Sequence, residues 1–130
     1  MRSAERGSPR TGTILLVEDD PDIRLSLVEL LTDEGYHVQA AVNGQDALDY
    51  LRQAPSLPKL ILLDLMMPVK DGFQFREEQL LDPELAGIPT IIVSADAHIA
   101  VKAAKAGVSE FLRKPVDLKA LFSLLTRYCN

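Results

Sequence analysis

A chain of 130 residues, 47% of them hydrophobic, has the size of one compact domain and no room for a second domain of ordinary size. Its formal net charge of -5 argues against direct binding of nucleic acid, which needs a basic surface. Its apolar runs are shorter than the roughly 18 residues of a membrane helix, and the N-terminus lacks the apolar core of a signal peptide. We therefore expect a cytoplasmic protein that binds neither nucleic acid nor membrane.

Several residues carry no predicted chemistry. Residues 1–12 are rich in Arg, Ser, Gly and Pro and lack apolar periodicity, which predicts a flexible leader before a folded domain over residues 13–130. Cys129 is the single cysteine, so it has no partner for an intrachain disulfide. His37 and His98 belong to no motif, and we expect both at the surface.

Five apolar runs alternate with five patterns typical of helices. In chain order, the predicted elements are a strand at 14–17, a helix between Asp20 and Gly35, a strand at 36–40, a helix at 45–53, a strand at 60–63, a helix at 72–81, a strand at 91–93, a helix at 97–106, a strand at 109–112 and a helix at 118–128. The runs at 14–17 and 60–63 are almost uniformly apolar, as in strands buried on both faces of a sheet. The run at 109–112 fits an edge strand. The 72–81 pattern has the poorest helical periodicity.

The expected helix ends also follow from residue types. Asp20, Asn43, Asp71 and Asp117 should accept hydrogen bonds from the first backbone N–H groups of the helices that follow them. Gly107 should end the helix before it. Because parallel strands are joined by right-handed crossovers, five strand and helix repeats predict an α/β fold, with one five-stranded parallel sheet doubly wound by five helices.

Polar residues follow four of the five strands, at the edge of the sheet where ligands gather in such folds. In chain order they are Glu18, Asp19, Asp64, Ser94 and Lys114. The second strand is followed by no such residue. A strand order of 2-1-3-4-5 puts that strand at the far edge and brings the four polar strand ends side by side.

These residue types suit phosphoryl chemistry. Three are carboxylates, which repel one another unless a cation lies between them, and Mg²⁺ prefers oxygen ligands. A carboxylate can attack an activated phosphorus atom and form an acyl phosphate. Mg²⁺, the Ser94 hydroxyl and the Lys114 ammonium could then each stabilise one oxygen of the transferred group.

Four fragments stand at the predicted strand ends: EDDP at 18–21, DLMMPVKDG at 64–72, SA at 94–95 and KP at 114–115. Each fragment is common alone. Together, and in this order, they resemble the response-regulator receiver family of bacterial two-component and phosphorelay systems, in particular its single-domain, chemotaxis-regulator-like members. The resemblance covers residues 13–128 and implies the flavodoxin-like receiver fold with strand order 2-1-3-4-5.

The resemblance implies a role for each site residue. Asp64 matches the phosphoacceptor. Glu18 and Asp19 match the acidic pair of a Mg²⁺ site, with Asp19 as the direct ligand and Glu18 acting through water. The Met66 backbone carbonyl would face the metal, while the Met66 and Met67 side chains are expected to serve only apolar packing.

The switch residues follow from the same resemblance. Ser94 matches the switch hydroxyl and Lys114 the lysine that contacts the phosphate, with a cis bond expected between Lys114 and Pro115. Phe111 matches the switch aromatic, although it could also be an ordinary core residue. In the family, the hydroxyl moves toward the phosphate and the aromatic ring turns inward, so the surfaces of the fourth helix and fifth strand change.

The implied function is a signalling switch that accepts a phosphoryl group on Asp64, with Mg²⁺, from a histidine kinase or phosphotransfer protein. The changed surface would control a downstream protein effector. Such a protein catalyses its own phosphorylation and dephosphorylation and is not a conventional enzyme. The first-helix face near Arg24 and Leu25 is expected to help select the kinase. We favour a stand-alone regulator over a receiver excised from a hybrid kinase. A dimer on phosphorylation is a further hypothesis, motivated by Leu121, Phe122, Leu124 and Leu125.

Three other functions fit part of the pattern. A flavodoxin-like cofactor carrier needs a phosphate-binding loop after the first strand, where Glu18 and Asp19 would repel the phosphate. A phosphatase of the haloacid dehalogenase type places its nucleophile after the first strand with a second Asp two positions on, whereas Asp64 follows the third strand and Met66 stands two positions on. A degenerate receiver that serves only as an interaction module would lack part of the acceptor set, which is complete here.

Overall fold

The computed structural model describes residues 12–129, so the predicted leader lies almost entirely outside the described residues. Its elements are β1 (Thr13–Val17), α1 (Pro21–Asp33), β2 (His37–Ala41), α2 (Gly44–Gln53), β3 (Leu60–Leu63), α3 (Gly72–Leu81), β4 (Thr90–Ser94), α4 (Ile99–Lys105), β5 (Phe111–Arg113) and α5 (Leu118–Cys129). All ten match predicted elements in type and order. Within the described range, no helix has the length and apolar character needed to cross a membrane.

The five strands form one parallel sheet in the order β2-β1-β3-β4-β5, as predicted. Successive side chains of a strand point to opposite faces, so a strand between two helical layers must be apolar at every position. In β1, Ile14 and Leu16 pack in one core cluster, while Leu15 and Val17 pack in the other. This explains the uniformly apolar runs of the two central strands.

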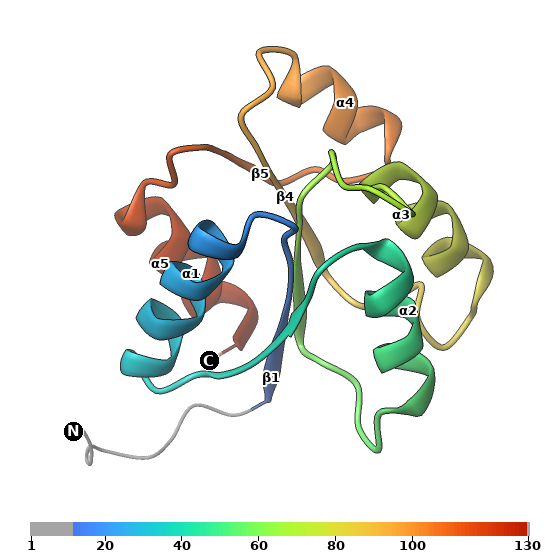
Figure 1. The fold of residues 1–130 in the computed structure, drawn as a ribbon, viewed down its shortest axis with the longest axis horizontal. Helices are drawn as coiled ribbons and strands as arrows, with labels where there is room; N and C mark the ends of the chain where they lie inside the picture. The colour runs from blue at the N-terminus through green and yellow to red at the C-terminus, as the bar shows by residue number, and fades with distance from the viewer. Residues whose placement is uncertain (1–11, 130) are drawn as a thin grey trace.

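Helices cover both faces of the sheet (Figure 1). Leu48 of α2, Phe75 of α3 and Ile99 of α4 belong to one core cluster. On the other face, α1 and α5 contribute to the second cluster, in which Leu121 and Leu125 are fully buried. Those two residues are therefore committed to the core, and among the four suggested dimer contacts only Phe122 and Leu124 remain partly accessible.

The predicted caps are confirmed. Asp20, Asn43 and Asp71 each accept hydrogen bonds from backbone N–H groups in the first turn of the helix that follows. Asp71 and Gln74 form a capping box, in which each side chain accepts from the other residue's backbone N–H. Asp117 accepts from a first-turn N–H of α5 at 3.0 Å. These bonds fix where the helices begin at the carboxyl end of the sheet.

The predicted start of α4 is wrong by two residues, because the helix spans Ile99–Lys105 instead of 97–106. The Asp96 carboxylate accepts a hydrogen bond from the His98 N–H at 2.7 Å, which holds the residues before the helix in a turn. The helix ends before Gly107 as expected, and Gly107 has a φ of +73°.

The outer strands are also displaced from their predicted ranges. β2 begins one residue after the predicted 36–40, and β5 begins two residues after the predicted 109–112. For β5, the ladder is set by its partner, since Val93 and Ser94 of β4 pair with Leu112 and Arg113. The register with a neighbouring strand, which no local pattern contains, decides these ends.

Candidate functional site

The register of the sheet brings the polar residues of β1 and β3 together. Val17 pairs with Leu63, so Glu18 and Asp64 follow neighbouring positions. The Asp64 N–H donates to the Val17 carbonyl and the Glu18 N–H to the Ala41 carbonyl, both at 3.0 Å. Glu18 is 1% exposed and Asp64 6% exposed. The sheet thus holds two carboxylates rigidly beneath its carboxyl edge.

Three carboxylates form a cluster there. Glu18, Asp19 and Asp64 each present an oxygen within 4.8 Å of the other two. Asp19 is more accessible to solvent than the other two. Because every donor is an oxygen and the charges repel, the cluster fits a hard divalent cation such as Mg²⁺. The predicted Glu18, Asp19 and Asp64 are therefore brought together as a possible metal site.

Lys114 supplies the positive charge of the cluster. Its Nζ lies 2.6 Å from Glu18 Oε1 and 3.4 Å from Asp64 Oδ2. Its backbone N–H donates to the Ser94 carbonyl at 3.0 Å, and its bond to Pro115 is cis, as the resemblance implied. Burial alone would lower the pKa of Lys114, but the hydrogen bond to Glu18 and the charges of Asp64 and Glu18 raise it above its usual value. The ammonium therefore stays charged between two carboxylates.

One ammonium does not compensate two buried carboxylates. Burial first, and then the charge of Glu18, raise the pKa of Asp64 to about 7, although Lys114 opposes them. The Met66 N–H is 3.4 Å from Asp64 Oδ1 and gives only weak support to the anion. Strongly perturbed carboxylates in a charged crevice are typical of reactive sites. The raised pKa makes Asp64 a candidate reactive group.

Two residues that hold the site were not predicted to do so. Arg24 Nη1 donates to the backbone carbonyls of Glu18 and Asp19 at 2.9 and 3.1 Å, so α1 fixes the loop that carries them. A Cβ on Gly72 would lie 2.5 Å from the Asp64 carbonyl oxygen, so only glycine fits there. No sequence pattern predicts the contacts of Arg24, because it is a single arginine inside a helix. The Asp71-Gly72 pair predicted a turn but not the close approach to Asp64.

The loop after Asp64 contains a strained turn. Val69 has a φ of +68°, which is rare for a β-branched residue. The Lys70 N–H donates to the Pro68 carbonyl at 2.7 Å and closes a three-residue γ-turn around Val69. The Val69 side chain is 81% exposed, so core packing does not offset the strain. Backbone strain of this kind clusters at functional loops.

Ser94 is the last residue of β4, and Phe111 is the first residue of β5. Ser94 is buried, and its hydroxyl oxygen accepts a hydrogen bond from the Asp96 N–H at 3.1 Å. The hydroxyl is thus joined to the loop that leads into α4. Phe111 pairs in register with Ile92, is half-buried, and packs against the core cluster that includes α4. Their switching roles stay predictions.

The predictions for the remaining residues are partly confirmed and partly wrong. Met67 is buried in the core as expected, but the Met66 side chain is 63% exposed, so its predicted packing role is wrong. The role of the Met66 backbone carbonyl stays a prediction. His37 and His98 are exposed, as predicted.

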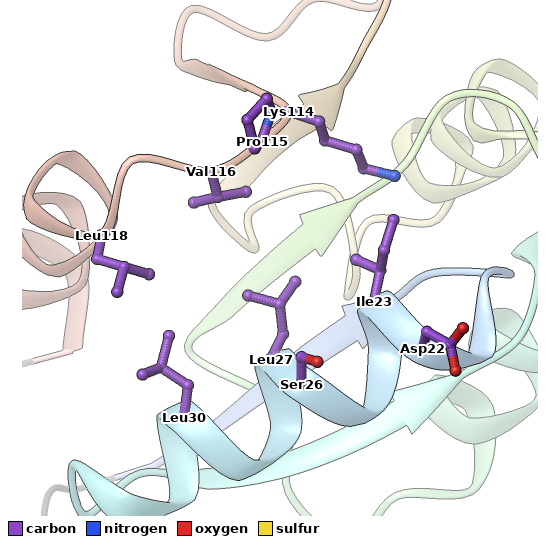
Figure 2. A pocket seen from close by; sticks show the side chains of 9 residues that line it. All are labelled: Asp22, Ile23, Ser26, Leu27, Leu30, Lys114, Pro115, Val116 and Leu118. Carbon is purple, nitrogen blue, oxygen red and sulfur yellow. The ribbon is translucent and has the colours of Figure 1, made fainter.

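An apolar groove of about 370 Å³ adjoins the cluster (Figure 2). It runs between α1 and the segment that follows β5, with Lys114 and Pro115 at its wall. Its apolar lining consists of Ile23, Leu27, Leu30, Val116 and Leu118. A partner surface that reached the carboxylates along α1 would meet this groove.

Comparison with known proteins identifies the family. The protein-family model described as the response regulator receiver domain matches residues 14–126 of this chain. An uncharacterised 14.6 kDa protein of Leptolyngbya boryana is 38% identical over 118 residues, which are 89% of this chain and 88% of that protein. Response regulator Rre1 of Synechocystis sp. is 34% identical over 108 residues, which are 81% of this chain and 46% of Rre1.

Solved structures agree. The receiver domain of a signal transduction histidine kinase from Syntrophus aciditrophicus superimposes with a TM-score of 0.81 at 31% identity, covering 91% of this chain and 89% of that one. The family binds Mg²⁺ at an acidic pocket, which corresponds to the cluster of Glu18, Asp19 and Asp64. With its strand order, its acidic cluster and a match over residues 14–126, the chain belongs to the response regulator receiver family.

Proposed function

We propose that the protein is a phosphorylation-activated switch in which Asp64 accepts a phosphoryl group from a phosphohistidine of a histidine kinase or phosphotransfer protein. The observation that carries the proposal is the buried Asp64 carboxylate, which shares one lysine with Glu18 and has a pKa raised to about 7. A group held in this way is poised for chemistry, since its charge is not satisfied by the fold.

The transfer needs little from the protein beyond position and charge. An Asp64 oxygen forms a bond to phosphorus while the bond from phosphorus to the donor imidazole nitrogen breaks, and the nitrogen keeps the electron pair. The Lys114 ammonium, 3.4 Å from Asp64 Oδ2, stabilises negative charge on the transferred group. The rigid ladder around Asp64 holds the nucleophile in place.

Glu18, Asp19 and Asp64 would hold Mg²⁺, together with the Met66 backbone carbonyl. The ion would neutralise charge on the phosphoryl oxygens. These residues fit because all offer oxygen ligands and because two of them are buried with too little positive charge nearby. Arg24 keeps the loop of Glu18 and Asp19 in position.

The same residues account for the end of the signal. The protein would catalyse its own dephosphorylation, in which water attacks phosphorus, the bond from phosphorus to the Asp64 oxygen breaks, and inorganic phosphate leaves the restored Asp64 carboxylate. Readout would begin at Ser94, whose hydroxyl would leave the Asp96 N–H and turn to the phosphoryl group. Phe111 and the surface of α4 and β5 would then rearrange and control a protein effector.

A protein donor is supported by the surroundings of the site. Leu25 is 61% exposed and Met66 63% exposed, and the apolar groove of Figure 2 adjoins Lys114. Apolar side chains exposed beside a charged site are typical of a protein interface. A histidine-bearing helix that packed along α1 would bury them while it presented its phosphoryl group to Asp64.

The direct test is incubation of the protein with Mg²⁺ and acetyl phosphate, followed by intact mass measurement. We expect wild-type protein to gain one acid-labile phosphoryl group only when Mg²⁺ is present. The Asp64→Asn variant should gain none, whereas Asp49→Asn, which changes an exposed aspartate of α2, should behave as wild type. Modification that persists in Asp64→Asn, or that needs no divalent cation, would contradict the proposal.

A further inference from the structure

The carboxyl end of α4 is held by a side chain from another helix. Arg76 of α3 donates through Nε to the Ala106 carbonyl at 2.9 Å and through Nη2 to the Gly107 carbonyl at 3.1 Å. The last carbonyls of a helix have no partner inside the helix and carry its negative dipole end. The guanidinium therefore binds the C-cap residue of α4 and the residue after it, and it ties this end of the helix to α3.

Arg76 is itself held in place by a buried polar network. Its Nη1 donates to Gln79 Oε1 at 2.9 Å and to Thr90 Oγ1 at 3.3 Å. Gln79 is fully buried, and its amide also donates to the backbone carbonyls of Leu85 and Ile88. The guanidinium is thus tied directly to α3 and β4 and, through Gln79, to the segment between them, so it has anchors other than α4.

The opposite end of α4 is held through the turn at Asp96, whose carboxylate accepts from the His98 N–H at 2.7 Å and whose carbonyl accepts from Arg113 Nη1 at 3.3 Å. His98 occupies the N-cap position of α4, and its side chain makes no capping hydrogen bond within the described residues. Asp96 forms an ion pair with Lys102 of α4, but both side chains are partly exposed, where such pairs contribute little. The Asp96 N–H donates to the Ser94 hydroxyl, which is the group expected to move on phosphorylation. The amino end of α4 is therefore joined through this turn to the phosphorylation site, whereas the carboxyl end is tied to α3.

From this contrast we infer that Arg76 is a positioning residue that makes α4 pivot about its carboxyl end. The inference rests on the proposed function. When Ser94 releases the Asp96 N–H, the amino end of α4 and its preceding turn move, while Ala106 and Gly107 stay fixed against α3. Without the guanidinium, both ends would be released, and α4 would shift as a whole.

The test compares the Arg76→Met variant with wild type by amide chemical shifts, before and after addition of Mg²⁺ and beryllofluoride as a phosphoryl mimic. In wild type, we expect the mimic to shift the amides of residues 95–102 strongly and those of residues 104–108 little. In Arg76→Met, the amides of residues 104–108 should also shift. A role in stability alone would not change which end of α4 responds.

Hydrogen exchange gives a second readout. The Ala106 and Val108 N–H groups donate to the carbonyls of Lys102 and Ala103 and report on the last turn of α4. Loss of the charge-assisted bonds from Arg76 should speed their exchange about tenfold. The matched control is Arg52→Met, because Arg52 of α2 donates to Glu78 on α3 and not to α4, and it should leave these rates unchanged.

Each outcome has a defined meaning. Equal responses of residues 104–108 in wild type and Arg76→Met would overturn the pivot, as would a wild-type response that is uniform along α4. If Arg76→Met does not fold, Arg76→Lys keeps the charge but lacks the planar fork that bonds both carbonyls, Gln79 and Thr90 at once, and it should still raise the response of residues 104–108. A failure of the proposed function looks different, since the amides of Asp64 and Met66 would then not respond in wild type.

Discussion

Buried polar side chains occur in two regions of this receiver domain, and the regions differ in how completely these side chains are paired. At the carboxyl edge of the sheet, Glu18 and Asp64 share one ammonium, and the charge of Asp64 is incompletely compensated. Between α3 and β4, the equally buried Gln79 has hydrogen-bond partners for both atoms of its amide. Satisfied polar networks specify structure, whereas incompletely compensated charge marks a reactive site.

The largest expected effect comes from removing the shared cation. Lys114→Met leaves Glu18 and Asp64 buried without a positive partner, which should lower the free energy of unfolding by about 3 kcal/mol at pH 8 without Mg²⁺. Urea denaturation measures this. Protonation of Asp64 relieves the repulsion, so the loss should be smaller at pH 5.5. Lys119→Met, an exposed lysine of α5, should change little, and an equal loss in both variants would contradict the account.

Loss of a hydrogen-bond partner in the Gln79 network should lower the free energy of unfolding. This loss should depend neither on pH nor on Mg²⁺. Gln79→Leu removes the amide's hydrogen bonds to the Leu85 and Ile88 carbonyls and its bond from Arg76, at a cost of about 2 kcal/mol. Phosphorylation by acetyl phosphate should be unaffected in the folded variant. Gln53→Leu, at an exposed position of α2, is the control. A Gln79→Leu variant that lost phosphorylation while it remained folded would contradict a purely structural role for this network.

A smaller effect is expected from the strained turn at the rim of the reactive region. Val69→Gly relieves the positive φ, and after the entropy cost of glycine it should stabilise the protein by about 0.5–1 kcal/mol in thermal or urea unfolding. Val42→Gly, at another exposed loop valine, should destabilise the protein instead. Destabilisation by both substitutions would show that the γ-turn stores no strain.

The sequence predicted the carboxylate cluster at the edge of the sheet better than the Gln79 network, for a physical reason. The central strands are buried on both faces, so they are uniformly apolar, and the first polar residue after each of them, Glu18 or Asp64, marks the carboxyl edge. Parallel pairing then places these residues together. Nothing beyond strand order and strand ends is needed to find them.

The network between α3 and α4 could not be found in this way. The buried Gln79 breaks the apolar pattern of its helix, and this explains why residues 72–81 had the poorest periodicity. Arg76 acts on a carbonyl 30 residues away, which no local pattern contains. The start of α4 was missed for a related reason, because the Asp96 side chain takes the His98 N–H and delays the helix. Side-chain to backbone bonds decided each of these features.

The central claim is that the fold leaves Asp64 charged at a cost that a divalent cation offsets. Its pKa of about 7 in the folded chain exceeds the ordinary 3.8, so stability from this group is full below about pH 4 and is lost as the pH rises toward 7. Above pH 7 the penalty is fully present. Asp64→Asn removes it, and Mg²⁺ bound to the wild type should reduce it.

The most direct measurement is therefore the free energy of unfolding of wild type and Asp64→Asn at pH 7.5, with and without Mg²⁺. Without Mg²⁺, Asp64→Asn should be more stable by about 1–2 kcal/mol, less than the roughly 4 kcal/mol that the full pKa shift would give, because the amide must also be buried. The gap should shrink at pH 5 and on addition of Mg²⁺ at pH 7.5. A wild type that is at least as stable as Asp64→Asn without Mg²⁺, or that gains no more from Mg²⁺ than the variant does, would contradict the account.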